Sequence, residues 1–144
     1  MPTLHLGVID QPYDNKGNAG QTTGEVAKIL EDKYGVMRAF YRTHGQEVAD
    51  ALQDSVAGAL ESLLLGAPVQ SDPFLAGASQ VERQFKEFLA SGEAERVGIP
   101  GTPTGAAMRG VNHRLKRPYL KSNPRRVSFI DTGLYSSSFK AWVD

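Results

Sequence analysis

Three glycines near the start of the chain are the first residues whose type and spacing could do chemistry. Gly17, Gly20 and Gly24 precede a predicted helix, and the N-terminus of a helix attracts phosphate groups. The stretch lacks the Gly-Lys-Ser/Thr ending of a phosphate loop, and its spacing is not that of a dinucleotide fingerprint. We therefore favour an ordinary loop over a nucleotide site or an enzyme built on this loop.

Oxygen-bearing side chains in the same stretch could gather around a hard cation. They are Asp10, Asp14, Asn15 and Asn18. A calcium loop ends in a bidentate Glu, and no Glu stands at that position here. The sequence predicts no metal site and no cofactor.

The histidines and serines form no recognisable catalytic pattern. His5, His44 and His113 are isolated from one another, and the chain has no Cys that could act as a nucleophile or thiolate ligand. The run from Ser136 to Ser138 lacks the glycines of a nucleophile elbow. We predict a protein without enzymatic activity.

The strongest chemical signal is positive charge between residues 109 and 126, which we call the basic segment. It contains no Asp or Glu, although the formal net charge of the whole chain is zero. Such a run exceeds what an ordinary mixed-charge surface needs, so these cations are candidates for an interface or for the lining of a DNA channel; a plain solvated face is the alternative. The seven cations are Arg109, Arg114, Lys116, Arg117, Lys121, Arg125 and Arg126.

The two parts of the chain have opposite charge. Residues 1–95 have 7 Lys and Arg against 14 Asp and Glu, a net charge of −7, whereas residues 96–144 have 9 against 2, a net charge of +7. The basic end can meet a polyanion or the acidic surface of another copy. Because the basic segment has Tyr119 as its one aromatic residue and no groove-reading motif, nucleic-acid binding would be independent of sequence.

The length and composition indicate one domain and no membrane segment. With 144 residues, 40% of them hydrophobic, the chain can bury a core without metals or disulfides. No apolar run approaches the roughly 18–20 residues that span a bilayer, and the start Met1 to His5 does not resemble a secretion signal. We expect synthesis in the cytoplasm.

Apolar spacing and capping motifs predict the elements of the first half. A strand is expected over residues 3–9, followed by a helix that begins with a capping box at Thr22 and ends at Gly35. A second box at Thr43 precedes an apolar stripe from Val48 to Leu64, which predicts the longest helix, with Leu60 buried. A third box at Ser79 predicts a helix over residues 80–90, after a loop over 66–77.

The second half is expected to hold one more helix and a hairpin. Thr102 can cap a helix that begins at Pro103 and ends before Pro118, so the basic segment would start on a helix. Residues 127–130 and 134–143 alternate around a turn at 131–133, which predicts two strands, with Trp142 buried. We expect an α+β fold, in which a small antiparallel sheet of N- and C-terminal strands packs on a long central helix with shorter helices and long loops.

In the order of its motifs the chain resembles the head-to-tail joining and tail-completion (neck) proteins of tailed bacteriophages. No single motif is specific, and the resemblance depends on their order along the chain. The motifs are Leu6-Gly7-Val8-Ile9, Val26-Ala27-Lys28-Ile29-Leu30-Glu31, Tyr34-Gly35, Arg38-Ala39-Phe40, the long helix, and Asp131-Thr132-Gly133-Leu134-Tyr135-Ser136 before a terminal strand.

This resemblance implies a structural protein of the virion without catalysis. It would form a homo-oligomeric ring in the neck or at the tail end, with the connector or portal on one side and tail proteins on the other. Genomic DNA would pass through its lumen, and the basic segment could contact it. The alternative from the residues alone is a nucleic-acid-binding protein that uses residues 109–126.

Overall fold

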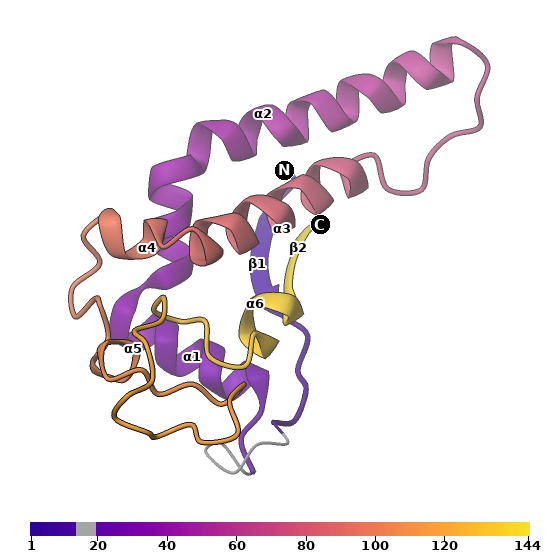
Figure 1. The fold of residues 1–144 in the computed structure, drawn as a ribbon. Helices are drawn as coiled ribbons and strands as arrows, with labels where there is room; N and C mark the ends of the chain where they lie inside the picture. The colour runs from indigo at the N-terminus through magenta and orange to yellow at the C-terminus, as the bar shows by residue number, and fades with distance from the viewer. Residues whose placement is uncertain (14–19) are drawn as a thin grey trace.

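The computed structural model describes residues 1–13 and 20–144 and has an α+β fold, as the sequence predicts (Figure 1). Within these residues, two strands near the ends of the chain enclose six helices of very different length. The elements are β1 (Leu4–Val8), α1 (Thr23–Tyr34), α2 (Val36–Leu64), α3 (Leu75–Ala90), α4 (Glu93–Arg96), α5 (Gly105–Met108), α6 (Leu134–Ser138) and β2 (Phe139–Val143).

The sheet joins the two ends of the chain, which confirms the predicted pairing. β1 runs antiparallel to β2, with Leu4 opposite Val143 and Leu6 opposite Ala141. A two-stranded sheet is marginal by itself in water, so it needs a helix against one face. α3 meets that need, because it contacts β2 on one side and α2 on the other.

Aromatic side chains from three elements form the centre of the core. The Phe85 ring of α3 stacks on Phe139 of β2, with 3.9 Å between ring centroids, and meets Phe40 of α2 edge to face at 5.3 Å. All three side chains are fully buried. The core therefore lies where α2, α3 and β2 meet.

The structure confirms both ends of the first helix. The Thr22 N–H donates to the Glu25 carboxylate at 3.0 Å, and the Glu25 N–H donates to the Thr22 hydroxyl at 3.3 Å, which is a complete capping box. The helix ends at Gly35, whose φ of 63° lies in the left-handed region.

The predicted start of the long helix at Thr43 is wrong, because α2 begins seven residues earlier at Val36. Its free N–H groups are satisfied by the preceding helix: the Glu31 carboxylate accepts from Met37 at 2.8 Å and from Arg38 at 3.2 Å. The predicted box instead marks a kink, since His44 has φ −111° and ψ 15° within the helix. Figure 1 shows the bend.

The predicted start of the third helix is also wrong. α3 begins at Leu75, so Ser79 lies inside it and the preceding loop is shorter than residues 66–77. The first turns of α3 pack closely on α2 at Gly77. A Cβ atom at that position would lie 2.6 Å from the Ala51 carbonyl oxygen. Only glycine permits this approach of the two helices.

Two corrections concern the second half of the chain. The N-cap of α5 is Thr104 rather than Thr102, and α5 ends at Met108 after one turn, so the basic segment does not begin on an extended helix. The predicted terminal hairpin is absent from the described residues. Residues 127–133 are irregular, residues 134–138 form α6, and only Phe139–Val143 is a strand.

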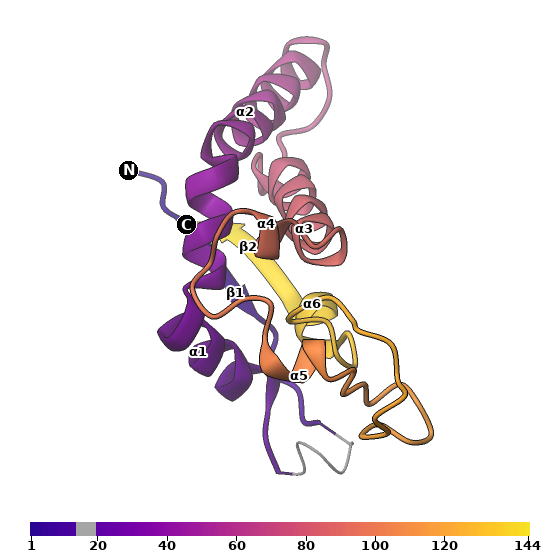
Figure 2. The ribbon, with the colours of Figure 1, turned by 60° about the vertical axis from the view of Figure 1, so that its left-hand side comes forward.

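The acidic and basic parts of the described chain are separated in space as well as in sequence. Residues 46–76, which we call the acidic arm, comprise α2 after the kink, the connecting loop and the first residues of α3; the basic segment lies at the opposite end of the molecule (Figures 1 and 2). The expectation that Leu60 is buried is wrong, because it is 55% exposed on the arm. Trp142 is 46% exposed and stacks on His5, so it is not buried either.

Candidate interaction surface

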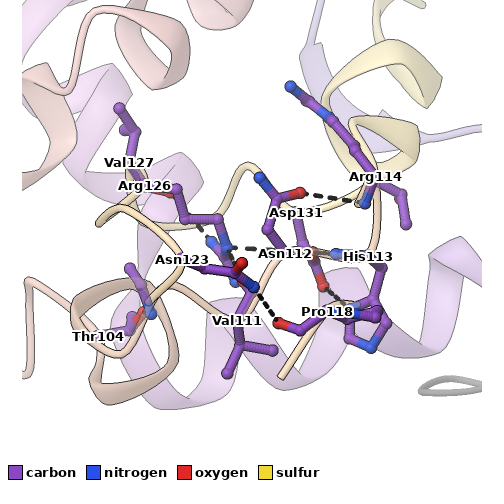
Figure 3. Close-up of polar contacts among 12 residues, drawn as sticks. Thr104, Val111, Asn112, His113, Arg114, Pro118, Asn123, Arg126, Val127 and Asp131 are labelled. Atoms are coloured by element: carbon purple, nitrogen blue, oxygen red, sulfur yellow. Dashed lines mark hydrogen bonds and ion pairs between the residues drawn. The ribbon is translucent and has the colours of Figure 1, made fainter. Parts of the chain in front are cut away.

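Asp131 lies at the centre of the contacts that hold the basic segment (Figure 3). Its carboxylate accepts from the backbone N–H of His113 at 2.7 Å and contacts the ring Nδ1 of His113 at 2.5 Å. The Nε atom of Arg126 lies 4.0 Å from Oδ1 of Asp131, the oxygen that accepts from the His113 N–H. One carboxylate therefore joins the first and last parts of the segment.

Arg126 is a structural residue rather than a surface cation. Its guanidinium donates to the carbonyl oxygens of Val111 and Val127, and its side chain is only 13% exposed. Burial lowers the pKa of Arg126, and the neighbouring Asp131 charge opposes that change. Of the seven candidate cations, this one faces inward.

The backbone between these anchors is held by two asparagines. The Asn112 N–H donates to the Pro118 carbonyl oxygen at 3.0 Å, and the Asn123 side-chain amide donates to the carbonyls of Arg117 and Pro118 at 2.8 and 3.1 Å. Gly110, with φ 69°, packs so closely that a Cβ atom would lie 2.4 Å from the Asn123 carbonyl oxygen. These contacts satisfy backbone groups that no helix or strand satisfies.

Glu95 of α4 anchors the end of the segment to the rest of the protein. Its carboxylate pairs with Arg125 and accepts from the Ser128 N–H at 2.8 Å and the Ser128 hydroxyl at 2.6 Å. Burial would raise the pKa of Glu95, but the hydrogen bonds from Ser128 and the charge of Arg125 outweigh it and lower the pKa. Arg125 therefore has a partner within its own chain.

The other five cations of the segment point outward. All five are exposed, and none forms an ion pair with a carboxylate in the part of the chain that the structure describes; the pairs made by this segment involve His113, Arg125 and Arg126. These free cations are Arg109, Arg114, Lys116, Arg117 and Lys121. They are the candidate interaction surface.

Sequence reasoning missed the roles of Asp131 and His113. The His113 ring contacts Asp131 through Nδ1 and the Tyr119 hydroxyl through Nε2, at 2.9 Å, which forms a chain of three side chains. The sequence indicates only that His113 is isolated from the other histidines. The available signal was composition, because Asp131 is one of only two acids in residues 96–144.

The residues considered as a cation or phosphate site make contacts within the fold where the structure describes them. Asp10 accepts from the Gly24 N–H at 2.9 Å, and hydrogen bonds from Thr22 and Gly24 lower its pKa. Asp10 thus binds the start of α1. Asp14, Asn15, Gly17 and Asn18 lie outside the described residues. Within residues 1–13 and 20–144, no three His, Asp or Glu side chains are grouped as metal ligands would be.

The other histidines and the serines also bind within the chain. His5 lies 2.9 Å from Asp144, and His44 contacts Glu47 at 2.7 Å and Glu93 at 2.9 Å. Ser137 and Ser138 donate to the Leu134 carbonyl oxygen, as serines in a helix do. Ser136 lies in the same short helix, α6.

No helix in the described part of the chain has both the length and the apolar character to cross a membrane.

Comparison with known proteins gives no relative from which a function could be taken. Searches against models of protein families, curated proteins and solved structures found no match to this chain.

Proposed function

We propose that this chain is a non-catalytic structural subunit that assembles head to tail with its own copies. The observation that carries the proposal is the set of five free cations on a segment whose backbone is anchored by contacts of Asp131, Arg126 and Glu95. A loop anchored in this way has less conformational entropy to lose when a partner docks.

The placement of opposite charges at opposite ends favours a ring. In a head-to-tail contact each subunit offers one surface and receives a different one, and the contacts close into a ring when the rotation between subunits permits. Attraction between an acidic and a basic surface also sets the register of each contact. A chain with one charge at each end can repeat the same contact around an axis.

The place of this ring, in our proposal, is the neck or tail end of a tailed-phage particle, between the connector and the tail. The order of motifs from Leu6 to the Asp131-Thr132-Gly133 stretch supports this placement. Cations left free by assembly would face passing DNA or an adjacent ring. Contact with DNA there would be independent of sequence and sensitive to salt.

The test is the mass of the protein in solution. Size-exclusion chromatography with light scattering should give a multiple of the 15.6 kDa monomer. The variant Arg114→Glu, Arg117→Glu, Lys121→Glu should remain monomeric with an unchanged circular dichroism spectrum, because exposed charges contribute little to stability. The matched control is Lys28→Glu, Arg42→Glu, Arg83→Glu, which changes the formal charge equally and should still assemble.

A second experiment tests the position in the particle. Purified connectors and purified tail tubes should each be mixed with the protein and imaged by electron microscopy. We expect an added ring on one end of at least one of them. A protein that stays monomeric and binds neither component would overturn the proposal.

The five free cations beside the exposed Tyr119 ring also favour a second function, sequence-independent nucleic-acid binding. If all five met phosphates of duplex DNA, the logarithm of the binding constant would fall with the logarithm of salt concentration at a slope of about −4.5. Fluorescence anisotropy at two salt concentrations measures this slope. Negligible binding at low salt would exclude the function.

A further inference from the structure

We propose that the acidic arm of one copy is the element that docks on the basic segment of the next copy. This inference rests on the proposed head-to-tail assembly and names the partner surface for the free cations. It follows from three properties of the arm: its charge, its exposed apolar tip and its position in the molecule.

All charged side chains of the arm are acidic. Residues 46–76 contain five Asp and Glu and no Lys or Arg. Four of the acids lie on α2 after the kink, at spacings of 3, 4 and 7 residues, which places them within one stripe of the helix surface. These four are Glu47, Asp50, Asp54 and Glu61, and all are exposed.

The tip of the arm exposes large apolar side chains next to this acidic stripe. Leu64 is 79% exposed, Leu65 is 82% exposed and Val69 is 78% exposed. Leu60, Leu63 and Leu75 are also exposed. Exposed apolar side chains concentrated in one segment are typical of a surface that another molecule covers.

The basic segment has the complementary pair of properties. Between and beside its free cations it exposes Leu115, Tyr119 and Leu120, and Met108 is exposed just before it. It contains no acid. Apolar side chains can therefore pack in the centre of the contact while opposite charges pair around them, as in other protein interfaces.

The two surfaces cannot meet within one copy. The tip of the arm and the basic segment lie at opposite ends of the molecule in both views (Figures 1 and 2). The α2–α3 pair is also fixed at its base, where Gly77 packs on Ala51 and the Ser55 hydroxyl donates to the Pro73 carbonyl at 2.8 Å. The contact is therefore between copies and uses a different surface of each.

The charge of the arm excludes nucleic acid as its occupant, since phosphates repel carboxylates. A partner for the arm must combine cations with apolar side chains. The basic segment of a second copy does so and is present in equal number by definition. The basic segment of a second copy is therefore the proposed occupant, rather than another virion protein.

Mixing two variants, each with one surface removed, tests the inference. The arm variant is Leu64→Asp, Leu65→Asp, and the segment variant is Arg114→Glu, Arg117→Glu, Lys121→Glu. Each should be monomeric alone. In an equimolar mixture, the intact arm of the segment variant meets the intact basic segment of the arm variant. Each pair of variants can form this one contact, because the other two surfaces are disrupted. The mixture should therefore give a species of twice the monomer mass.

Controls separate a lost surface from a lost fold. Ile29→Asp replaces an exposed apolar side chain on α1 and should assemble like the wild-type protein. Circular dichroism should show each variant folded. If the arm variant is unfolded, Leu60→Asp, at another exposed site on the arm, replaces it in the same mixture.

The remaining outcomes are distinguishable. A wild-type protein that assembles together with an arm variant that also assembles would overturn this inference and leave the proposed function standing. A mixture of two folded variants that stays monomeric would likewise exclude the contact. A wild-type protein that stays monomeric at every concentration and binds neither connector nor tail would overturn both proposals.

Discussion

The acidic arm and the basic segment obtain their order in opposite ways. The arm is regular α-helix over most of its length, yet its last helical turns contact little besides solvent, as the exposure of Leu60 and Leu64 shows. The basic segment has no helix or strand between residues 109 and 126, yet its backbone is bonded to Asn112, Asn123 and Arg126. Regular structure and tertiary fixation are therefore separate properties in this protein.

The reason lies in the backbone hydrogen bonds. A helix satisfies the N–H and C=O groups of its interior, so the last turns of α2 can project from the core with few tertiary hydrogen bonds. A loop cannot do so, and its polar groups must find partners elsewhere. Side chains that bind the loop are consequently unavailable to partners, whereas the surface of the arm remains free.

The largest contrast is expected between a core residue and the tip of the arm. Phe85→Ala should lower the free energy of unfolding by about 3–5 kcal/mol, because it leaves a cavity between α2, α3 and β2. Leu64→Ala, a truncation at the exposed tip, should change it by less than about 0.5 kcal/mol. Chemical denaturation of both variants measures the difference, and a large loss in Leu64→Ala would show that the tip is packed within its own copy.

Substitution of one glycine in each segment compares how tightly the two segments are packed. Gly110→Ala should cost about 2–4 kcal/mol, because a positive φ is combined with a Cβ atom against the Asn123 backbone. Gly66→Ala on the arm has a positive φ but no neighbouring atom within 4 Å, so it should cost about 1 kcal/mol. Thermal melting of the two variants checks the order, and equal losses would mean that the basic segment yields as easily as the arm.

Asp131→Asn should loosen the basic segment without unfolding the arm. Neutralising this partly buried carboxylate weakens its contacts with His113 and Arg126, at a cost of about 1–3 kcal/mol. Hydrogen exchange should accelerate at the Asn112 and Asn123 amides and remain unchanged at Val48 in the arm. Unchanged exchange in the basic segment would contradict the central position of Asp131.

The smallest expected effect is the response to pH at the kink of α2. Burial would lower the pKa of His44, but the hydrogen bonds and charges of Glu47 and Glu93 outweigh it and raise the pKa above its ordinary value of 6.5. The folded state therefore binds the proton more tightly than the unfolded state. This stabilisation is fully present below about pH 6.5 and is lost as pH rises through the raised pKa.

Melting temperatures measured across this pH window provide the check. The wild-type protein should lose more stability than His44→Gln as the pH rises, because the variant has no proton to lose at this position. The same loss in both proteins would exclude His44 as its source.

Local signals in the sequence predicted both ends of α1 correctly. The capping box at Thr22 and the glycine at position 35 define α1 because both act within a few residues. The start of α2 could not be found in this way, because its first N–H groups are satisfied by Glu31 from the preceding helix, whereas the sequence pattern places the start at the box of Thr43. The apolar stripe showed which face of α2 is apolar, but not that Leu60 lies beyond the reach of α3.

Composition predicts the candidate surface, and contacts within the chain show which of its cations are held by carboxylates. Seven cations without an acid are visible in the sequence, and five of them are free in the described chain. The inward direction of Arg126 and the pairing of Arg125 depend on Asp131 and Glu95, which lie 5 and 30 residues away. Neither contact has a periodic signal. The strand predicted at 127–130 failed for a similar reason, since Ser128 binds Glu95 instead of a neighbouring strand.

Zero-length chemical cross-linking tests the contact between arm and basic segment most directly. A carbodiimide joins a lysine amine only to a carboxylate that touches it, and mixing ordinary with nitrogen-15-labelled protein identifies links between copies. In the assembled wild-type protein we expect Lys116 or Lys121 to be joined to Asp50, Asp54 or Glu61 in peptides of mixed isotope. An assembled protein in which neither lysine is linked to the arm would contradict the proposed contact.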